Sequence, residues 1–178
     1  MKNKLRIYAK EHRKSLNINF LSDKICKNIF SLPEYKMAKN IFTYYPIEYE
    51  VNLLKILDDS SKKFYLPKVN NDKLVFCPYI YNKLKNGKYN IPEPDTKPID
   101  NLSIVDLIIV PALAADKSGF RIGYGKGFYD RFLNEIDKSI PKLTTVFSDL
   151  FIDNVYPDKY DVNCDIVVTD KNVYRIKC

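Results

Sequence analysis

Residues 105–133 read VDLIIVPALAADKSGFRIGYGKGFYDRFL. The first six of them, Val105–Val110, are apolar apart from Asp106, and a run without polar alternation is typical of a strand buried on both faces. A helix is predicted from Gly127 to Ile136, and a glycine-rich segment joins it to the strand. A buried strand, a loop and a helix in this order are typical of layered α/β proteins.

The glycine-rich segment is unusual for this chain, which has only five glycines. Four of them fall within nine residues, at Gly119, Gly123, Gly125 and Gly127. Glycine is favoured where the backbone takes positive φ or where a ligand approaches the main chain. The segment follows the carboxyl end of a predicted strand, where open α/β sheets bind ligands. Free N–H groups at a helix start favour phosphate, and Arg121 and Lys126 add positive charge. The alternative is a glycine turn without a ligand.

The segment matches neither of the general nucleotide-binding motifs. A Walker A loop needs glycine five residues before the Gly-Lys pair, where this chain has Phe120, and Ser or Thr after the lysine, where it has Gly127. The dinucleotide fingerprint needs a third glycine at position 128, which is phenylalanine. A more particular pattern is therefore required.

Strands and helices alternate along the rest of the chain, which predicts one α/β domain over residues 1–178. Apolar spacing and breakers predict helices over 2–16, Asn19–Ser31 and Val51–Leu57. Short apolar or aromatic runs predict strands over Asn40–Tyr45, Lys63–Leu66, Leu74–Tyr79, Leu143–Phe147 and Ile166–Thr169. The proline-rich segment Gly87–Pro98 is predicted to be an extended surface loop that crosses between halves of the sheet.

Composition points to a folded protein of the cytosol. Hydrophobic residues make up 46% of the 178 residues, enough to form a full core. The four cysteines form no CxxC pair and lie apart from the single His12, so we expect reduced thiols and no zinc site. No apolar run reaches the roughly 18–20 residues of a membrane span, and no signal peptide is recognisable. We expect a cytoplasmic protein that does not enter the membrane.

The net charge of +7 is densest at the N-terminus, where six basic residues accompany the single acid Glu11. Such a charge suits a nucleic acid, an anionic lipid or a small polyanion. The simpler alternative is a solvated, lysine-rich helix face. Basic residues and many tyrosines suit single-stranded nucleic acid, but no RNA-binding signature is visible. We therefore expect no specific nucleic-acid partner.

The segment Val110–Leu133 resembles the signature of the 5-formyltetrahydrofolate cyclo-ligase family, also called methenyltetrahydrofolate synthetases. That signature is a strand, Pro-Gly, an Asp, and then Arg-Leu-Gly-x-Gly-x-Gly-Tyr-Tyr-Asp. Other landmarks of the family appear in order, so the resemblance covers nearly the whole chain; they are Lys2–Arg6, Tyr45–Val51, Leu66–Pro67, Gly87–Pro94 and Asp161–Asp170.

Four positions depart from the family pattern. Ala112 replaces the usual glycine, Ala115 stands where an aromatic residue is common, and Tyr160 stands where histidine is frequent. Phe128 replaces the first tyrosine of Tyr-Tyr-Asp, which keeps the aromatic face and loses one hydroxyl.

The resemblance implies a fold and a reaction. The fold is a three-layer α/β/α arrangement with a mostly parallel, Rossmann-like (NagB/RpiA-like) sheet and a helical N-terminus. The reaction converts 5-formyltetrahydrofolate into 5,10-methenyltetrahydrofolate with ATP and Mg²⁺, releasing ADP and phosphate. ATP phosphorylates the formyl oxygen, N10 attacks the activated carbon, and phosphate departs. Such chemistry demands mainly positioning and charge neutralisation. The resemblance further implies a monomer with ATP and 5-formyltetrahydrofolate as its small-molecule partners.

The resemblance also assigns residues to each ligand. Lys126 and Arg121 are the implied catalytic residues, because they neutralise and enclose the phosphates. The implied ATP site consists of Lys2, Asn3, Lys4, Leu5, Arg6, Arg121, Ile122, Gly123, Tyr124, Gly125, Lys126, Gly127, Phe128 and Tyr129. The implied folate site consists of Tyr45, Glu50, Tyr124, Gly125, Lys126, Gly127 and Phe128.

Asp130 and Asp165 are implied to hold Mg²⁺, because a hard cation bound with phosphates needs only one or two carboxylates. Each assignment has a structural alternative. Asp130 could instead be an acid in the first turn of a helix, where it complements the helix dipole. Asp165 could cap a turn before its strand, and Glu50 could be an acid at the start of a helix. Tyr45 is alternatively a core residue and Lys2 a frayed terminus.

Two other functions remain open at this stage. One is a family relative that keeps the nucleotide loop and lacks the folate reaction. The other is a basic nucleic-acid-binding protein.

Overall fold

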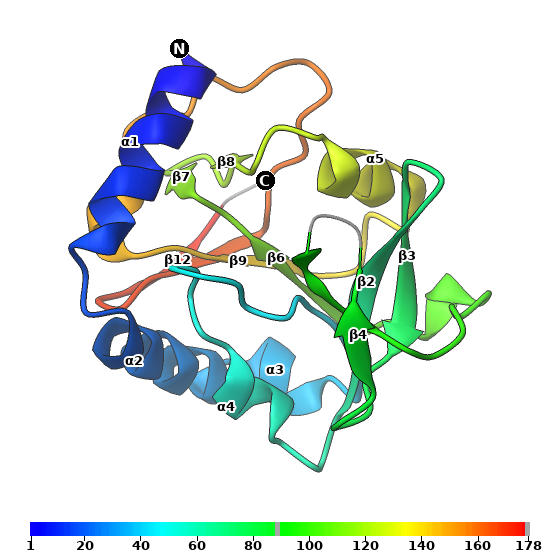
Figure 1. Ribbon diagram of the computed structural model, residues 1–178. Helices are drawn as coiled ribbons and strands as arrows, with labels where there is room; N and C mark the ends of the chain where they lie inside the picture. Colours follow the sequence, from blue (N-terminus) through cyan, green and yellow to red (C-terminus); the bar gives the residue numbers. More distant parts are fainter. Residues whose placement is uncertain (88–89, 177–178) are drawn as a thin grey trace.

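A seven-stranded sheet runs through the centre of the molecule in the computed structural model, which describes residues 1–87 and 90–176 (Figure 1). The strand order is β12-β11-β9-β6-β1-β2-β3. Every neighbouring pair is parallel except the two edge pairs, β12 with β11 and β3 with β2. The strands are β1 Asn40–Phe42, β2 Lys63–Asn70, β3 Lys73–Pro78, β6 Leu107–Pro111, β9 Lys142–Thr145, β11 Ile166–Val168 and β12 Val173–Arg175.

Helices cover both faces of this sheet, with α2, α3 and α4 on one side and α5 on the other (Figure 1). The helices are α1 Lys2–Lys14, α2 Ile18–Ser31, α3 Pro33–Met37, α4 Leu54–Leu57 and α5 Phe128–Glu135, with the short 3-10 helices η2 Leu102–Ile104 and η3 Ser148–Leu150. The three-layer α/β/α prediction with a mostly parallel sheet and a helical N-terminus is confirmed.

The central strands bury side chains on both faces. Ile41 and Ile109 belong to the apolar cluster beneath α2–α4, whereas their neighbours Phe42 and Ile108 belong to the cluster beneath α5. This alternation explains why β6 is a continuous apolar run. The interrupting Asp106 precedes β6, and its Oδ2 accepts hydrogen bonds from the backbone N–H groups of residues 39 and 40, at 2.9 and 2.8 Å. Asp106 therefore ties the amino ends of β6 and β1 together.

A small three-stranded sheet, in the order β10-β7-β8, lies beside α1 and leads into the glycine loop (Figure 1). Its strands are β7 Ala114–Asp116, β8 Arg121–Ile122 and β10 Phe151–Ile152. Asp116 is buried and accepts hydrogen bonds from the N–H groups of Ser118, Phe120 and Val155. One carboxylate thus fixes the β7–β8 turn and attaches the segment after β10 to it.

The prediction of a surface loop over Gly87–Pro98 is wrong at its centre. Pro92–Pro94 forms β5, which pairs antiparallel with β4, Leu84–Asn86. Proline is tolerated there because a strand at an edge needs fewer backbone N–H donors. Glu93 is buried, and its Oε1 accepts the N–H of Val69 on β2 at 3.2 Å. The β4–β5 hairpin is therefore attached to the main sheet; residues 88 and 89 lie outside the described residues.

The predicted helix over Val51–Leu57 is shorter than expected, because only Leu54–Leu57 is helical. Val51 and Leu53 are buried just before the helix, and the Tyr44 hydroxyl donates to the Val51 carbonyl at 3.1 Å. Apolar packing and this hydrogen bond hold the preceding residues out of the helix.

Three of the four cysteines, Cys26, Cys77 and Cys164, are buried and unpaired, in agreement with the expected reduced thiols. Cys178 lies outside the described residues. Within residues 1–87 and 90–176, no helix has both the length and the apolar character that a bilayer span requires.

Candidate active site

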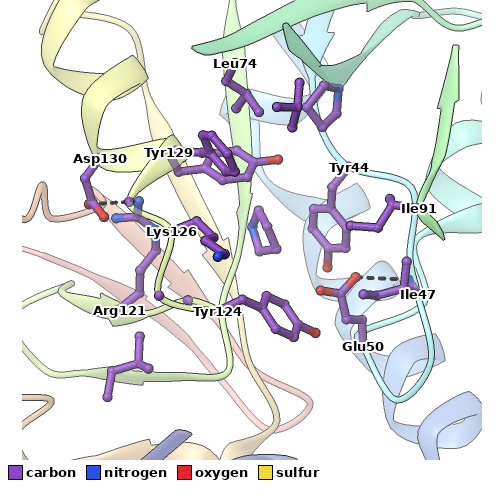
Figure 2. Close-up of a pocket in the computed structure, with 18 of the residues that line it drawn as sticks. Tyr44, Ile47, Glu50, Leu74, Ile91, Arg121, Tyr124, Lys126, Tyr129 and Asp130 are labelled. Carbon is purple, nitrogen blue, oxygen red and sulfur yellow. Dashed lines mark hydrogen bonds and ion pairs between the residues drawn. The ribbon is translucent and has the colours of Figure 1, made fainter. Parts of the chain in front are cut away.

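A cavity of about 580 Å³ opens at the carboxyl ends of the parallel strands β1, β2 and β6. The start of α1, the segment from β8 to α5 and the β4–β5 hairpin surround it. Figure 2 shows Arg121, Tyr124, Lys126, Tyr129 and Asp130 on one side of this cavity, opposite Tyr44, Ile47, Glu50 and Ile91. This is the position that the strand–loop–helix pattern predicted for a ligand site.

The glycines of the glycine loop, residues 119–127, serve two different purposes. Gly119 has φ +80, and a Cβ there would lie 2.3 Å from the Cys164 carbonyl oxygen, so this glycine serves the turn. Gly125 has φ +97 and lies against Arg6, and it lines the cavity. Every residue from Arg121 to Asp130 lines the cavity as well. The part of the loop after β8 therefore faces a ligand site, and the turn before β8 supports it.

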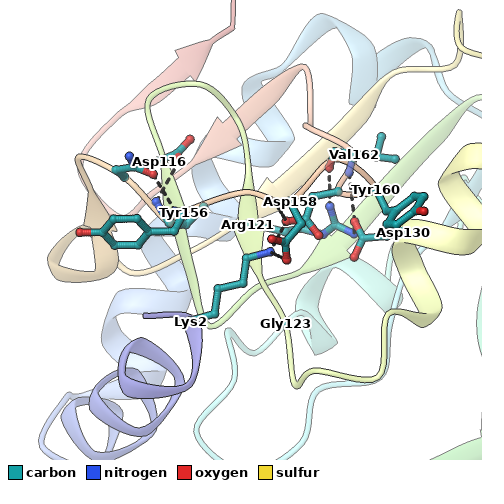
Figure 3. A network of polar contacts seen from close by, with 12 residues as sticks. Lys2, Asp116, Arg121, Gly123, Asp130, Tyr156, Asp158, Tyr160 and Val162 are labelled. Carbon is teal, nitrogen blue, oxygen red and sulfur yellow. Dashed lines mark hydrogen bonds and ion pairs between the residues drawn. The ribbon is translucent and has the colours of Figure 1, made fainter.

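One end of the cavity is rich in charge. Arg121 is 3% exposed in its side chain, and its Nη2 donates to Asp130 Oδ1 at 3.0 Å. Its Nη1 donates to the Val162 carbonyl at 2.6 Å, and the Val162 N–H donates to Asp130 Oδ1 at 3.2 Å (Figure 3). Arg121 therefore holds together β8, the first turn of α5 and the chain before β11.

Lys2 joins the N-terminus to the same end. Its ammonium contacts Asp158 Oδ2 at 2.6 Å and also donates to Asp161 Oδ2 (Figure 3). Desolvation lowers the pKa of Lys2, but the hydrogen bonds to the two carboxylates outweigh it and raise the pKa. Arg6, one turn further along α1, donates from Nε to the Gly123 carbonyl at 3.0 Å. Lys2 is therefore ordered rather than frayed.

Glu50 lies at the other end, 7% exposed. Its Oε2 accepts the N–H of Ile47 at 3.0 Å. Burial raises the pKa of Glu50, while the Ile47 N–H, the Tyr124 hydroxyl and the nearby Arg13 oppose that shift. Figure 2 shows Tyr124 extending across the cavity toward Glu50. A buried carboxylate with few protein partners suits a ligand that offers N–H donors.

Arg13 supports this end from outside the cavity. Its side chain is fully buried, and its Nη2 donates to the carbonyls of Ala112 and Leu113, the latter at 3.1 Å. Its guanidinium also lies over the Phe147 ring, 5.6 Å from the centroid. Arg13 is one of the six basic residues near the N-terminus, for which the sequence left a solvated helix face or an anionic partner open. Its burial depends on carbonyls about a hundred residues away, which the sequence pattern does not report.

An apolar wall completes the cavity, made of Pro67, Val69, Leu74, Ile91 and Pro92. It comes from β2, β3 and the β4–β5 hairpin, and none of these residues was expected at the site. Only the pairing of β2 with β3 and the attachment of the hairpin bring them together. No local sequence pattern carries that information.

Comparisons with known proteins identify the family. The profile of the "5-formyltetrahydrofolate cyclo-ligase family" matches residues 1–170. The chain belongs to the 5-formyltetrahydrofolate cyclo-ligase family. It is 29% identical over 145 residues to the 5-formyltetrahydrofolate cyclo-ligase of Mycolicibacterium smegmatis, covering 75% of each chain. It is 29% identical over 148 residues to that of Haemophilus influenzae, covering 78% of this chain and 79% of the other.

Solved structures of the same family have a similar fold. The NMR structure of Aquifex aeolicus 5,10-methenyltetrahydrofolate synthetase superimposes with a TM-score of 0.86 and 32% identity, covering 99% of this chain and 93% of that one. The 5,10-methenyltetrahydrofolate synthetase of Mycoplasma pneumoniae follows with a TM-score of 0.76 and 26% identity, covering 95% and 98%. The chain is accordingly an enzyme of the cyclo-ligase family.

The structure gathers most of the residues that the cyclo-ligase resemblance assigned to ligands. Those that line the cavity are Lys2, Tyr45, Glu50, Arg6 and the run from Arg121 to Asp130. Asn3, Lys4 and Leu5 do not line it. Asn3 instead accepts a hydrogen bond from Arg6 at 2.6 Å, and Leu5 packs against the core.

Asp165 also lies away from the cavity. It precedes β11 at the amino end of the strand, and its Oδ2 accepts the N–H of Lys142 at 2.7 Å and pairs with its ammonium at 2.9 Å. The other aspartates that line the cavity, besides Asp130, are Asp158 and Asp161. Of the two carboxylates expected to hold Mg²⁺, Asp130 therefore lines the cavity and Asp165 does not.

The described residues contain no cluster of three histidine, cysteine or acidic ligands that forms a complete metal site by itself. Asp130 and Asp161 still fit Mg²⁺, because that ion keeps several waters and takes one or two carboxylates together with phosphate oxygens. The charged end of the cyclo-ligase cavity therefore suits a metal ion that arrives with a phosphate ligand.

Proposed function

We propose that this chain converts 5-formyltetrahydrofolate into 5,10-methenyltetrahydrofolate, with ATP as co-substrate and ADP and phosphate as products. The observation that carries the proposal is a single cavity with a cation-rich end beside the glycine loop and a buried carboxylate at the other end. A phosphate donor and a flat N–H-bearing heterocycle would then lie side by side. Family membership supports the same pair of substrates.

The cation-rich end would bind the triphosphate. Arg6 and Lys126 line it, and Arg121 is fixed by Asp130 and the Val162 carbonyl. Because Arg121 is already oriented, little reorganisation is needed when charge develops on the transferred phosphoryl group. Figure 2 shows Lys126 extending from the loop into the cavity, where its ammonium would meet that group.

The opposite end would bind the folate. The Glu50 carboxylate would accept two N–H groups of the pterin, and the apolar wall would cover its ring. The formyl oxygen would then face the glycine loop and take the γ-phosphoryl group, with ADP leaving. N10 would attack the activated formyl carbon, and the C–O bond to phosphate would break as the ring closes. The protein's part is to hold the reacting atoms together and exclude water.

Asp130 and Asp161 are the residues that would hold Mg²⁺, in place of the pair Asp130 and Asp165. Held there, the ion would supply positive charge that offsets the negative charge of the triphosphate. Lys2, which contacts Asp158 and Asp161, would turn from these carboxylates toward a phosphate.

The direct test incubates the purified chain with MgATP and 5-formyltetrahydrofolate, and follows methenyl absorbance and ADP release together. We expect both products in equal amounts and neither when one substrate is omitted. ATP hydrolysis without methenyl product would contradict the proposal and favour a relative that lacks the folate reaction.

A further inference from the structure

The cavity contains one polar atom that the protein leaves unsatisfied. The hydroxyl of Tyr129 is buried, and no hydrogen-bond partner for it exists among the described residues. Native proteins pair most buried hydroxyl groups, so an unpaired one calls for a cause. Tyr129 lines the cavity from the first turn of α5. A partner that belongs to a ligand is the simplest cause.

The surroundings of this hydroxyl indicate which ligand. Figure 2 shows the Tyr129 ring directed into the cavity below Leu74, toward the side that carries Tyr44. Figure 2 shows the Glu50 carboxylate on that same side of the cavity, next to Tyr44. An apolar wall and a carboxylate suit a neutral heterocycle better than a triphosphate. The hydroxyl therefore belongs to the folate end of the cavity.

The hydroxyl is also a hydrogen-bond donor, because a tyrosine hydroxyl is protonated at neutral pH. Glu50 at the same end is an acceptor. The folate end thus offers an acceptor and, from the other side of the cavity, a donor. A pterin carries N–H groups beside a carbonyl oxygen, which matches this pattern.

We propose that the Tyr129 hydroxyl donates a hydrogen bond to an acceptor atom of the bound folate and that Tyr129 is a folate-binding residue. The inference rests on the proposed function, and it moves Tyr129 from the nucleotide to the folate.

The matched pair of variants is Tyr129→Phe and Tyr44→Phe. The Tyr44 hydroxyl has two protein partners, the Val51 carbonyl at 3.1 Å and Thr145 Oγ1 at 2.9 Å. Removing it should lower the Tm of the ligand-free protein by about 2–4 °C. Removing the Tyr129 hydroxyl takes away an unsatisfied group, so the ligand-free Tm should stay the same or rise. A hydroxyl with a merely structural role would not give that result.

The experiment measures the ligand-free Tm and the dissociation constants for 5-formyltetrahydrofolate and for MgATP, with the full chain. We expect Tyr129→Phe to weaken folate binding about 3- to 10-fold, the usual effect of one hydrogen bond, with unchanged MgATP binding. Unchanged folate binding, weaker MgATP binding alone, or a Tm loss like that of Tyr44→Phe would each overturn the inference and leave the proposed function standing. Wild-type protein that binds no folate would overturn both.

Discussion

Glu50 illustrates how one buried side chain links stability to ligand binding. Burial raises its pKa above the usual 4.5, so the folded protein binds this proton more tightly than the unfolded chain does. The ionised carboxylate therefore costs stability above its folded pKa. That cost disappears as the pH falls through the folded pKa toward 4.5, because the group is then protonated in both states. A residue retained at such a cost is a functional candidate.

We predict that Glu50→Gln is more stable and less able to bind folate. The variant should have a higher Tm than wild type at pH 7–8, and the difference should shrink as the pH falls toward 4.5. Folate binding should weaken about 10- to 100-fold, because a charge-assisted acceptor is replaced by an amide. Tm profiles against pH and folate titrations test both parts. A variant less stable than wild type at pH 8 would refute the electrostatic argument.

For Lys126 we predict the opposite effect: its removal should lower turnover without changing stability. It is exposed in the glycine loop and extends into the cavity (Figure 2). Lys126→Ala should lower kcat about 10²- to 10³-fold, the range for removal of one group that stabilises transition-state charge. Its Tm should remain within about 1 °C of wild type. Lys27→Ala on α2, exposed and far from the cavity, is the control. Wild-type turnover in Lys126→Ala would remove Lys126 from catalysis.

At the scale of elements, a buried arginine joins the end of α1 to the chain that follows β6. Arg13 donates hydrogen bonds to two carbonyl groups just after β6 and lies near Glu50. We predict that Arg13→Met lowers the free energy of unfolding by about 2–3 kcal/mol, because charged hydrogen bonds are lost and the carbonyls lose their donor. Lys14→Met, which loses only an exposed pair with Glu11, should cost less than about 0.5 kcal/mol. Urea unfolding of both variants gives the comparison, and equal midpoints would contradict it.

The β4–β5 hairpin is a second element, and the buried Glu93 side chain helps to hold it in position. A Cβ at Gly87 would lie 2.0 Å from Glu93 Cδ, and Glu93 attaches the hairpin to β2. We predict that Gly87→Ala lowers stability by about 1–3 kcal/mol through overpacking and weakens folate binding by moving Ile91 and Pro92. MgATP binding should persist, since the hairpin forms only the apolar wall. Asn86→Ala, next in the chain and exposed, is the control; urea unfolding and ligand titration distinguish the two.

At the scale of the whole molecule, the fold was predictable where burial produces a recognisable apolar pattern in the sequence. The unbroken apolar run of β6 and the glycine loop after it predicted a covered parallel strand and a ligand site at its carboxyl end. The prediction failed for Pro92–Pro94, whose strand depends on attachment by Glu93 rather than on local propensity. It also overestimated the helix that ends at Leu57, because tertiary packing overrides propensity there.

The site was predictable in part for the same reason. The residues from Arg121 to Asp130 are continuous in the sequence, and all of them line the same cavity. Asp161 reaches the cavity through Lys2, which lies 159 residues away along the chain, and no local pattern reports such a pairing. Asp165 precedes β11 at its amino end and pairs with Lys142, whereas the cavity opens at the carboxyl ends of the parallel strands.

Side chains join three segments at the cavity that are distant in sequence. Lys2 contacts Asp158 and Asp161, Arg6 contacts Gly123, and Arg121 contacts Val162. A ligand that binds these cations stabilises all three segments at once. At a hundredfold excess over its Kd it adds about 2.7 kcal/mol, or about 5–10 °C in Tm for a chain of this size.

We predict that MgATP raises the Tm of Asp161→Asn less than that of wild type. The Mg²⁺-dependent part of the rise should be lost, because the variant lacks a carboxylate for the ion. Asp165→Asn should behave differently, since it breaks the pair with Lys142 and lowers the ligand-free Tm. It should keep the full MgATP increment, because it lies outside the cavity. Thermal melts with ATP and EDTA, and with ATP over a Mg²⁺ titration, separate the two variants. A normal Mg²⁺ response in Asp161→Asn with a lost response in Asp165→Asn would restore Asp165 as the ligand, and would require the segment before β11 to move when the nucleotide binds.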